Sequence, residues 1–235
     1  MRYFFEPSKV LWGFFLDGKS DWALWGSVLA FFFLIAGTSY LLGSINSAVI
    51  ISKTMYHRDV RECGSGNAGM TNMFRSFGKA AGFLTLVGDV LKALIAVSIG
   101  FVLLGNPGQY IAGFFCMLGH MFPVYFRFKG GKGVIVSAIT ILLIDPLVFA
   151  VLLLIFALMF AATQIISASS ITAAFFFPLV QYAFNSNQPT NIISLLFSFF
   201  IAAFVIAMHR DNIHRILNRT EKKFTIKKKD KDENE

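Results

Sequence analysis

The sequence has few charged residues for its length. Asp, Glu, Lys and Arg make up 14% of its 235 residues, whereas hydrophobic residues make up 56%. The mean hydropathy of +0.65 is far above that of soluble proteins. Apolar runs of about 20 residues, the length that crosses a bilayer, recur along the chain with few polar positions inside them. A soluble globular fold is therefore excluded, and the sequence predicts an all-α integral membrane protein.

Cysteine is also scarce, and several kinds of catalytic site are missing. Cys63 and Cys116 do not have the spacing of a metal site, and Cys63 lies in a segment expected in the cytoplasm, where disulfides rarely persist. The stretch "FKGGKG" (128–133) lacks the earlier glycine of a Walker A loop, and Val134 stands where Ser or Thr binds magnesium. No Ser-His-Asp trio is evident either. We therefore expect no metal, no cofactor and no ATP hydrolysis.

Acidic residues are outnumbered, so the formal net charge is +8. The excess is confined to three segments beside apolar runs: nine Lys or Arg in 209–235, five in 52–79 and three in 127–132. Cations in such loops orient helices with the loops on the cytoplasmic side. No basic, aromatic-rich soluble face accompanies them, so we expect no nucleic-acid partner. Residues 1–21 carry Glu6, Asp17 and Asp21, lack a clean basic start and show no small-residue cleavage site, which argues against a cleaved signal peptide.

Placing all three basic segments on one side predicts a bundle of about seven transmembrane helices, with the N-terminus outside and the C-terminus in the cytoplasm. The predicted spans are 22–43, continued to 53 by "GSINSAVIISK", then 80–105, 109–128, 134–144, 147–163, 165–184 and 192–208. A re-entrant segment at 132–144, with only two crossings after it, is the alternative. We divide the chain into an N-terminal segment expected along the outer interface (1–21), one membrane-embedded domain (22–223) and a charged tail (224–235).

Between two apolar runs lies "GSGNAGMTN" (64–72), which we read as a loop. Such a stretch cannot face lipid, because its backbone amides would lack partners there. Glycines let backbone amides converge on an anion, and Ser, Asn, Thr and a following Arg add donors suited to phosphate. A flexible loop without a ligand is the alternative. The candidate anion-binding residues here are Gly64, Ser65, Gly66, Asn67, Thr71, Asn72 and Arg75.

Other polar residues stand at the ends of spans or inside them. Lys132 follows Gly130 and Gly131 in a second candidate phosphate loop, although lysines there also serve as positive-inside anchors. Asp89 and Lys92, three apart in an apolar span, are expected to form a structural ion pair, with a direct part in catalysis as the alternative.

A third set lies toward the C-terminus. Ser170 belongs to the serine-rich "SASSIT", whose hydroxyls often bond only to their own helix. His209 and Asn212 share a helix face where the last span ends, and a histidine there exchanges protons near neutral pH or simply marks the interface. Glu221 follows. His120 we expect to pack or to support other groups. If these motifs converge, they suit a substrate with a phosphate head and an apolar tail, with chemistry based on positioning and electrostatics.

In their order along the chain, these motifs resemble the bacterial acyl-phosphate:glycerol-3-phosphate acyltransferase family. The resemblance covers about residues 23–223 and includes "GSINSAVIISK", "GSGNAGMTNMFRSFGK", "GDVLKA", "GHMFPVYFRFKGGKG", "SASSIT" and "HRDNIHRILNRTE". It implies a polytopic enzyme of the bacterial cytoplasmic membrane that moves a fatty acyl group from acyl phosphate to the 1-hydroxyl of glycerol 3-phosphate. The products would be lysophosphatidic acid and inorganic phosphate. Neither coenzyme A nor acyl carrier protein would be the direct donor, and the enzyme is taken as a monomer.

The resemblance also implies roles for single residues. Ser65, His209 and Asn212 would be catalytic, with His209 orienting the departing phosphate, which accepts the proton, or acting as the base itself. The substrate-binding residues would be Gly64, Gly66, Asn67, Thr71, Arg75, Gly130, Gly131, Lys132 and Ser170. Glu221, Asp89 and Lys92 would be structural.

The sequence departs from the family pattern at a few places. Asn46 replaces a usual proline, Ala93 and Arg219 replace usual glycines, and Met70 replaces a usual alanine. The first three changes concern backbone shape, whereas Met70 narrows the pocket and concerns acyl-chain preference. Two other classes remain open at this point: a transporter of a phosphorylated solute, suggested by charges within spans, and a membrane scaffold with an anion-binding loop.

Overall fold

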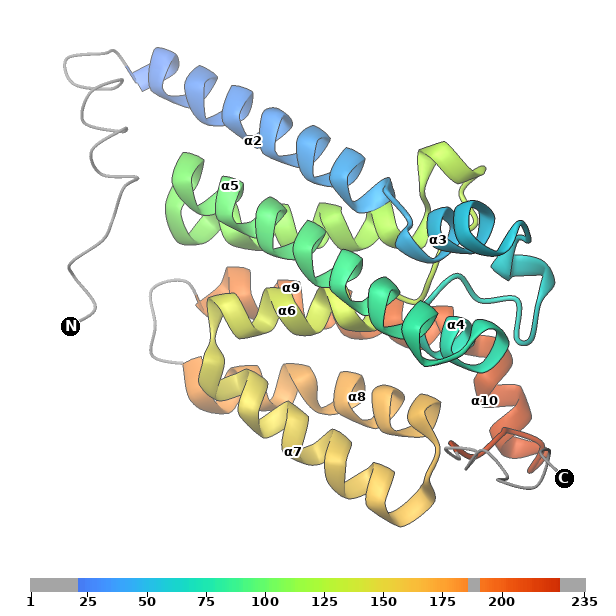
Figure 1. The fold of residues 1–235 in the computed structure, drawn as a ribbon. Helices are drawn as coiled ribbons and strands as arrows, with labels where there is room; N and C mark the ends of the chain where they lie inside the picture. Colours follow the sequence, from blue (N-terminus) through green and yellow to red (C-terminus); the bar gives the residue numbers. More distant parts are fainter. Residues whose placement is uncertain (1–20, 186–190, 225–235) are drawn as a thin grey trace, which may run out of the picture.

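The computed structural model describes residues 21–185 and 191–224. The predictions for residues 1–20 and for the tail from 225 onward lie outside these residues. The regular structure described is entirely helical, as predicted (Figure 1). Its elements are α2 (Asp21–Ser44), α3 (Ser47–Tyr56), η1 (Val60–Glu62), α4 (Met70–Phe77), α5 (Lys79–Met121), η2 (Val124–Phe126), α6 (Val134–Ile144), α7 (Pro146–Thr163), α8 (Ile166–Asn185), α9 (Asn191–Met208) and α10 (Arg210–Leu217).

The long element α5 reverses its direction at Gly105. A continuous helix would separate Lys92 from His120 by about 42 Å at 1.5 Å per residue, yet Lys92 Nζ lies 2.8 Å from His120 Nδ1. Gly105 has a φ of 62°, a conformation that glycine adopts without strain. The backbones of Gly100 and Gly108 approach so closely across the bend that a Cβ on either would overlap the other. The turn predicted at 106–108 is thus confirmed to within one residue, and α5 consists of two antiparallel halves.

Two short elements near the first span differ from the prediction. The helix expected to continue to residue 53 stops at Ser44, and α3 starts after Asn46, whose Oδ1 accepts a hydrogen bond from Val49 N at 3.0 Å. Asn46 therefore caps a new helix where the apolar pattern suggested continuity. The stretch read as a loop after residue 64 contains the helix α4, which the glycines preceding it conceal in the sequence.

Four helical stretches of the described residues are long and apolar enough to cross a bilayer, and α9 with α10, bent by 60°, forms a fifth candidate. One of the four runs from Lys79 to Phe126 and contains the reversal at Gly105. The helix α6 spans only 11 residues, and Asp145 ends it by capping α7, with its Oδ1 accepting from the N–H groups of Leu147 at 3.2 Å and Val148 at 3.1 Å. The chain is thus a multi-pass, all-helical membrane protein, while the count of seven spans and their orientation stay predictions.

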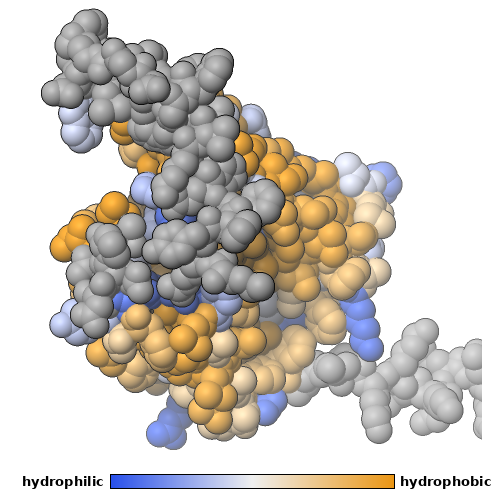
Figure 2. All heavy atoms as spheres, turned by 90° about the vertical axis from the view of Figure 1, so that its left-hand side faces the viewer, coloured by the Kyte–Doolittle hydropathy of each residue, from blue (hydrophilic) through white to orange (hydrophobic). Residues whose placement is uncertain are grey.

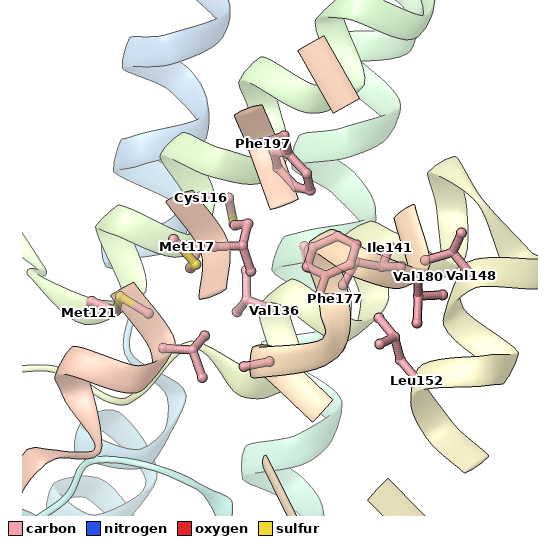
Figure 3. Packing of buried hydrophobic residues seen from close by; sticks show 14 of the residues in the cluster. Cys116, Met117, Met121, Val136, Ile141, Val148, Leu152, Phe177, Val180 and Phe197 are labelled. Atoms are coloured by element: carbon pink, nitrogen blue, oxygen red, sulfur yellow. The ribbon is translucent and has the colours of Figure 1, made fainter. Parts of the chain in front are cut away.

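The interior of the bundle is apolar and joins five helices. Figure 3 shows side chains from α5, α6, α7, α8 and α9 in one cluster, among them Met117, Val136 and Phe177, all of which are buried. Large apolar side chains also cover the outside: Phe33 is 69% exposed and Phe175 is 67% exposed. The described side chains on the face in Figure 2 are mostly hydrophobic. An apolar exterior of this extent suits a lipid environment rather than water.

Candidate active site

A cavity of about 660 Å³ opens at the end of the bundle where α4 and α10 lie (Figure 1). It is bounded by the segment before α4, the segment before α6, the first turns of α8, and the residues that follow α9. The sequence-predicted residues that line it are Gly64, Ser65, Asn67, Thr71, Asn72, Arg75, Asp89, Lys132, Ser170, His209, Asn212 and Glu221. Motifs separated by about 150 residues in the sequence therefore face one hollow.

The first wall of the cavity is the glycine-rich segment 63–69, which is held by one buried amide. Asn72 is 2% exposed, and its Nδ2 donates to Val60 O at 3.1 Å and Cys63 O at 2.9 Å. The same nitrogen donates to the carbonyl oxygen of Asn67 at 3.0 Å, and Asn72 Oδ1 accepts from Ser65 N at 3.0 Å. Asn72 was predicted as an anion donor. Its amide hydrogens instead fix the loop that carries the donors.

The helix α4 directs its N-terminal end at the cavity. Its N-cap is Gly69, which has no side chain to satisfy the first amides, and Gly69, Met70 and Thr71 all line the hollow. The orphan N–H groups and the dipole of a helix N-terminus favour a bound anion. In the described part of the chain, no group forms a hydrogen bond with the hydroxyl of Ser65 or of Thr71. This wall therefore offers a set of unused donors.

The sequence did not predict the ion pair between Arg61 and Asp59 that helps to fix the loop before this wall. Arg61 binds Asp59 through two parallel contacts, Nε to Oδ1 at 3.0 Å and Nη2 to Oδ2 at 2.7 Å. Its Nη1 donates to Phe126 O at 2.9 Å, which ties the loop to η2. The Arg61 hydrogen bonds hold the pKa of the Asp59 carboxyl well below its usual range. Loop cations next to spans are so common that nothing in the sequence singled this one out.

The opposite wall is a charged network centred on Glu221. Its Oε1 accepts from Asn212 Nδ2 at 2.6 Å and from Ser167 Oγ at 2.7 Å, and its Oε2 accepts from Arg215 Nε at 2.6 Å. Lys132 Nζ in turn donates to Asn212 Oδ1. Ser167 and Arg215 had no role in the prediction, although Arg215 lies one helical turn beyond Asn212 and so shares its face.

The pKa shifts of the two charged residues Glu221 and Lys132 in this network have different causes. Burial opposes ionisation of Glu221, but the hydrogen bonds from Arg215, Ser167 and Asn212 outweigh it and hold the pKa of the carboxyl below its usual value. Burial lowers the pKa of the Lys132 ammonium to about 8, although the nearby Glu221 charge raises it again in part. Lys132 is therefore a cation at neutral pH that is close to losing its proton.

His209 lies at the break between α9 and α10 and is 2% exposed. Its Nδ1 lies 2.7 Å from Val205 O. A carbonyl oxygen only accepts, so Nδ1 carries a proton and Nε2 is the atom that gains or loses one. No other described group forms a hydrogen bond with Nε2, and the residue lines the cavity. The geometry thus presents one imidazole nitrogen to whatever the cavity holds.

Several predicted site residues behave differently from expectation. The N–H groups of Gly130 and Gly131 donate to Met121 O and His120 O, both at 3.1 Å, so they cannot cradle a phosphate, and neither glycine lines the cavity. Gly66 also lies outside it, with its N–H donated to Cys63 O at 2.9 Å. Ser170 lines the cavity, but its hydroxyl donates to Ile166 O at 2.9 Å, which was the alternative reading.

The cation Arg75 lies at the rim. It is exposed, and its Nη2 donates to Lys222 O at 3.3 Å, which brings the C-terminal segment across the cavity mouth. The side chain of Lys92 does not line the hollow, and it forms the predicted buried ion pair with Asp89 at 2.8 Å.

One side of the cavity is apolar. Phe156 and Phe160 stack with their centroids 6.3 Å apart, and Phe160 contacts Phe224 edge to face at 6.2 Å. Together with Ile166 they line the hollow between α7 and α8. A cavity with donors and cations on two walls and aromatic rings on a third fits a molecule that has both an anionic head and an apolar tail.

The sequence as a whole was compared with known proteins. A family model described as glycerol-3-phosphate acyltransferase matches residues 32–219. The chain belongs to the glycerol-3-phosphate acyltransferase family. A relative of that name from Geobacillus kaustophilus is 39% identical over 81% of this chain and 94% of its own. Another from Bacillus subtilis is 37% identical over 79% of this chain and 93% of its own.

Solved structures show the same relationship. The crystal structure of PlsY (YgiH), an integral membrane glycerol 3-phosphate acyltransferase, in its glycerol 3-phosphate form aligns with a TM-score of 0.74 at 35% identity, covering 83% of this chain and 96% of that one. Its lysophosphatidic acid form aligns with a TM-score of 0.71 at 34% identity, covering 83% and 95%. This membrane acyltransferase assignment confirms the family inferred from the ordered motifs and sets aside the transporter and scaffold alternatives.

Proposed function

We propose that this acyltransferase moves a fatty acyl group from acyl phosphate to the 1-hydroxyl of glycerol 3-phosphate. The products are lysophosphatidic acid and inorganic phosphate, and the transfer is direct, without an acyl-enzyme. The observation that supports this most is the convergence of Ser65, Lys132 and His209, from three distant segments, on one cavity with an aromatic wall. The two PlsY structures are described as glycerol 3-phosphate and lysophosphatidic acid forms, which matches the acceptor and the product proposed here.

The two polar walls suit two phosphorylated substrates at once. We assign the acyl phosphate head to the wall of Ser65, Asn67 and Thr71, where the N-terminal amides of α4 attract an anion. We assign the phosphate of glycerol 3-phosphate to Lys132 and Arg75. The acyl tail then follows Phe156 and Phe160 toward lipid.

The chemistry requires little covalent help, because an acyl phosphate is a mixed anhydride. The hydroxyl oxygen of glycerol 3-phosphate forms a bond to the acyl carbon, the bond from that carbon to the phosphate oxygen breaks, and the hydroxyl proton ends on the departing phosphate. His209 Nε2 accepts a hydrogen bond from the protonated oxygen of the departing phosphate and so orients it, and Lys132 and the amides before α4 stabilise the charge that develops on the oxygens. Asn212 keeps Lys132 in place through the contact described above.

The arrangement of the basic segments supports a membrane topology as well. We propose seven passes, with α5 supplying two, the N-terminus outside and the cavity open to the cytoplasm, where glycerol 3-phosphate is dissolved. A monomer suffices, because the described cavity is complete within one chain.

The test is turnover by the purified full-length protein in lipid nanodiscs. With palmitoyl phosphate and glycerol 3-phosphate, we expect phosphate and lysophosphatidic acid in equal amounts, and with palmitoyl coenzyme A we expect neither. Ser65→Ala and His209→Ala should each lose turnover by about a hundredfold or more, because donors aimed at developing charge contribute on that scale. His214→Ala is the matched control for the histidine, since His214 is exposed and lies outside the cavity.

Absence of phosphate release by folded wild-type protein that binds both substrates would overturn the proposed activity. Full turnover in His209→Ala would instead show that the histidine is misassigned.

A further inference from the structure

A buried charged cluster borders the cavity, between the two halves of α5. It consists of Asp89, Lys92 and His120, which are 2%, 5% and 4% exposed. Lys92 Nζ lies 2.8 Å from Asp89 Oδ1, 2.8 Å from His120 Nδ1 and 3.0 Å from Ile45 O. A lysine ammonium has three N–H donors and no acceptor, so these three partners use all of them.

This arrangement fixes the tautomer of His120. His120 Nδ1 also lies 3.5 Å from Asp89 Oδ1, to which it could donate only if it carried a proton. The Lys92 ammonium is nearer, at 2.8 Å, and can only donate, so Nδ1 accepts from it and carries no proton. The neutral imidazole then has its hydrogen on Nε2. Asp89 neutralises the ammonium within the apolar interior, where an unpaired charge would be costly, so the pair keeps Lys92 in the charged form that this tautomer requires.

The ring is held in place from its other side by the loop before α6. The backbone carbonyl oxygen of His120 accepts a hydrogen bond from Gly131 N at 3.1 Å. A Cβ atom at Gly131 would overlap Nε2 of the His120 ring. His120 also lines the cavity. In the described residues, no protein group forms a hydrogen bond with Nε2, although the side chain is almost fully buried. The structure therefore contains a pre-oriented donor with no protein partner, at a cavity that attracts anions.

We propose that His120 is a substrate-binding residue of this enzyme, whose Nε2–H donates to a phosphoryl oxygen in the cavity, and that Lys92 and Asp89 are the positioning residues that hold this donor in its tautomer. The identity of the phosphorylated substrate rests on the proposed function, whereas the donor itself follows from the contacts alone. Gly131 then has a different role from binding phosphate through its backbone. Only a residue without a side chain at this position leaves room for the His120 ring.

Two substitutions at His120 separate the role of Nε2 as a hydrogen-bond donor from the role of Nδ1 as an acceptor for Lys92. In His120→Asn, the amide oxygen replaces Nδ1 and still accepts from Lys92, but the donor is lost. In His120→Gln, the amide nitrogen replaces the Nε2 donor, but the acceptor for Lys92 is lost. We expect kcat/KM for glycerol 3-phosphate acylation to fall in His120→Asn by about tenfold or more, the scale of a hydrogen bond to a charged group, and to fall less in His120→Gln. The proposed donor role is overturned if His120→Asn is as active as the wild type. It is also overturned if His120→Gln is no more active than His120→Asn.

A measurement on the wild-type protein keeps the inference testable if either variant fails to fold. In full-length protein with ¹⁵N-labelled histidine in nanodiscs, the His120 signals should show the Nε2–H tautomer, and the Nε2–H proton should shift on addition of inorganic phosphate. Lys92→Met should mix the two tautomers. An Nδ1–H tautomer, or an Nε2–H signal that saturating phosphate leaves unmoved, overturns the proposal even in an active enzyme. Failure of the wild type to release phosphate would overturn the proposed function and leave this spectral result intact.

Discussion

The two polar walls of the cavity are built by different physics. The wall before α4 is held by a neutral amide, Asn72, whose partners are backbone atoms of residues 60–67 and the hydroxyl of Ser76. The wall beside α10 is held by a carboxylate, Glu221, whose partners are side chains from α8 and α10. The first network has no charge, whereas the second contains an acid and, through Asn212, a lysine.

This difference separates shape from chemistry. A neutral buried network does not respond to pH or salt, and it fails as a unit when its centre is removed, because buried carbonyls are left without donors. A charged network in a partly open cavity shifts the pKa of its members. Here burial lowers the pKa of Lys132, and the charge of Glu221 raises it again in part. The network of Asn72 therefore decides whether the loop before α4 forms, and the network of Glu221 affects the pKa of Lys132.

The largest effect is expected from breaking the neutral wall. Asn72→Ala removes the donor to Val60, Cys63 and Asn67 and the acceptor for Ser65. We expect it to lower the free energy of unfolding by about 3 kcal/mol or more, since several buried partners lose their hydrogen bonds together. Thermal unfolding in detergent, followed through tryptophan fluorescence, measures the loss.

The control for this prediction is Asn218→Ala, because Asn218 is exposed and contacts only His214 through its side chain. Equal stability of the two variants would show that the loop does not depend on the amide.

A smaller effect is expected from neutralising the charged wall. Glu221→Gln keeps the size of the side chain but weakens its bonds to Arg215, Ser167 and Asn212. We expect the protein to fold and kcat/KM for glycerol 3-phosphate to fall by about thirtyfold, because the loss of one charge-assisted hydrogen bond costs about 2 kcal/mol. Steady-state phosphate release measures it, with Glu62→Gln on the exposed face as control. Unchanged kinetics would mean that the network does not support Lys132.

The same contrast explains how much of the molecule could be predicted from sequence. The apolar helices and the reversal near Gly105 follow from apolar length and from a turn sequence, both of which are local. The family and most of the polar residues that line the cavity followed from motifs in a known order. The roles of Asn72, Arg61 and Ser167 did not, because each depends on a partner far along the chain or on a carbonyl that carries no side-chain signal.

The errors have physical causes too. Gly130 and Gly131 looked like a phosphate cradle, yet their amides bind the end of α5, and a pattern of glycines does not show where its N–H groups point. The break before α3 was missed because Asn46 sits among apolar and small residues, and only its capping contact reveals the new helix. His120 was expected to pack or to support other groups, and the sequence does not show which way its Nε2 faces.

Arg75 sharpens the comparison, because it lies at the rim between the walls and belongs to neither network. Arg75→Lys should raise the KM for glycerol 3-phosphate by about tenfold and change kcat less, since an ammonium cannot reproduce the two parallel donors of a guanidinium on phosphate. Initial rates over a range of glycerol 3-phosphate concentrations separate the two constants. Arg210→Lys, at an 85% exposed side chain, should leave both unchanged. A fall in kcat alone would place Arg75 with the reacting groups instead.

The smallest effect tests the charged wall without disrupting it. The pKa of Lys132 is about 8, and its charged form binds phosphate, so binding is complete below this pH and is lost as pH rises through it. Between pH 7 and 8 the charged fraction should fall about twofold, and kcat/KM should fall with it, because this constant reports the free enzyme. Glu221 raises the pKa of Lys132, so Glu221→Gln should move the decline to lower pH. Lys132→Arg should remove the decline, since a guanidinium stays charged throughout this range. A decline that persists in the arginine variant would have to come from another group, and the proton affinity of Lys132 would then play no part in catalysis.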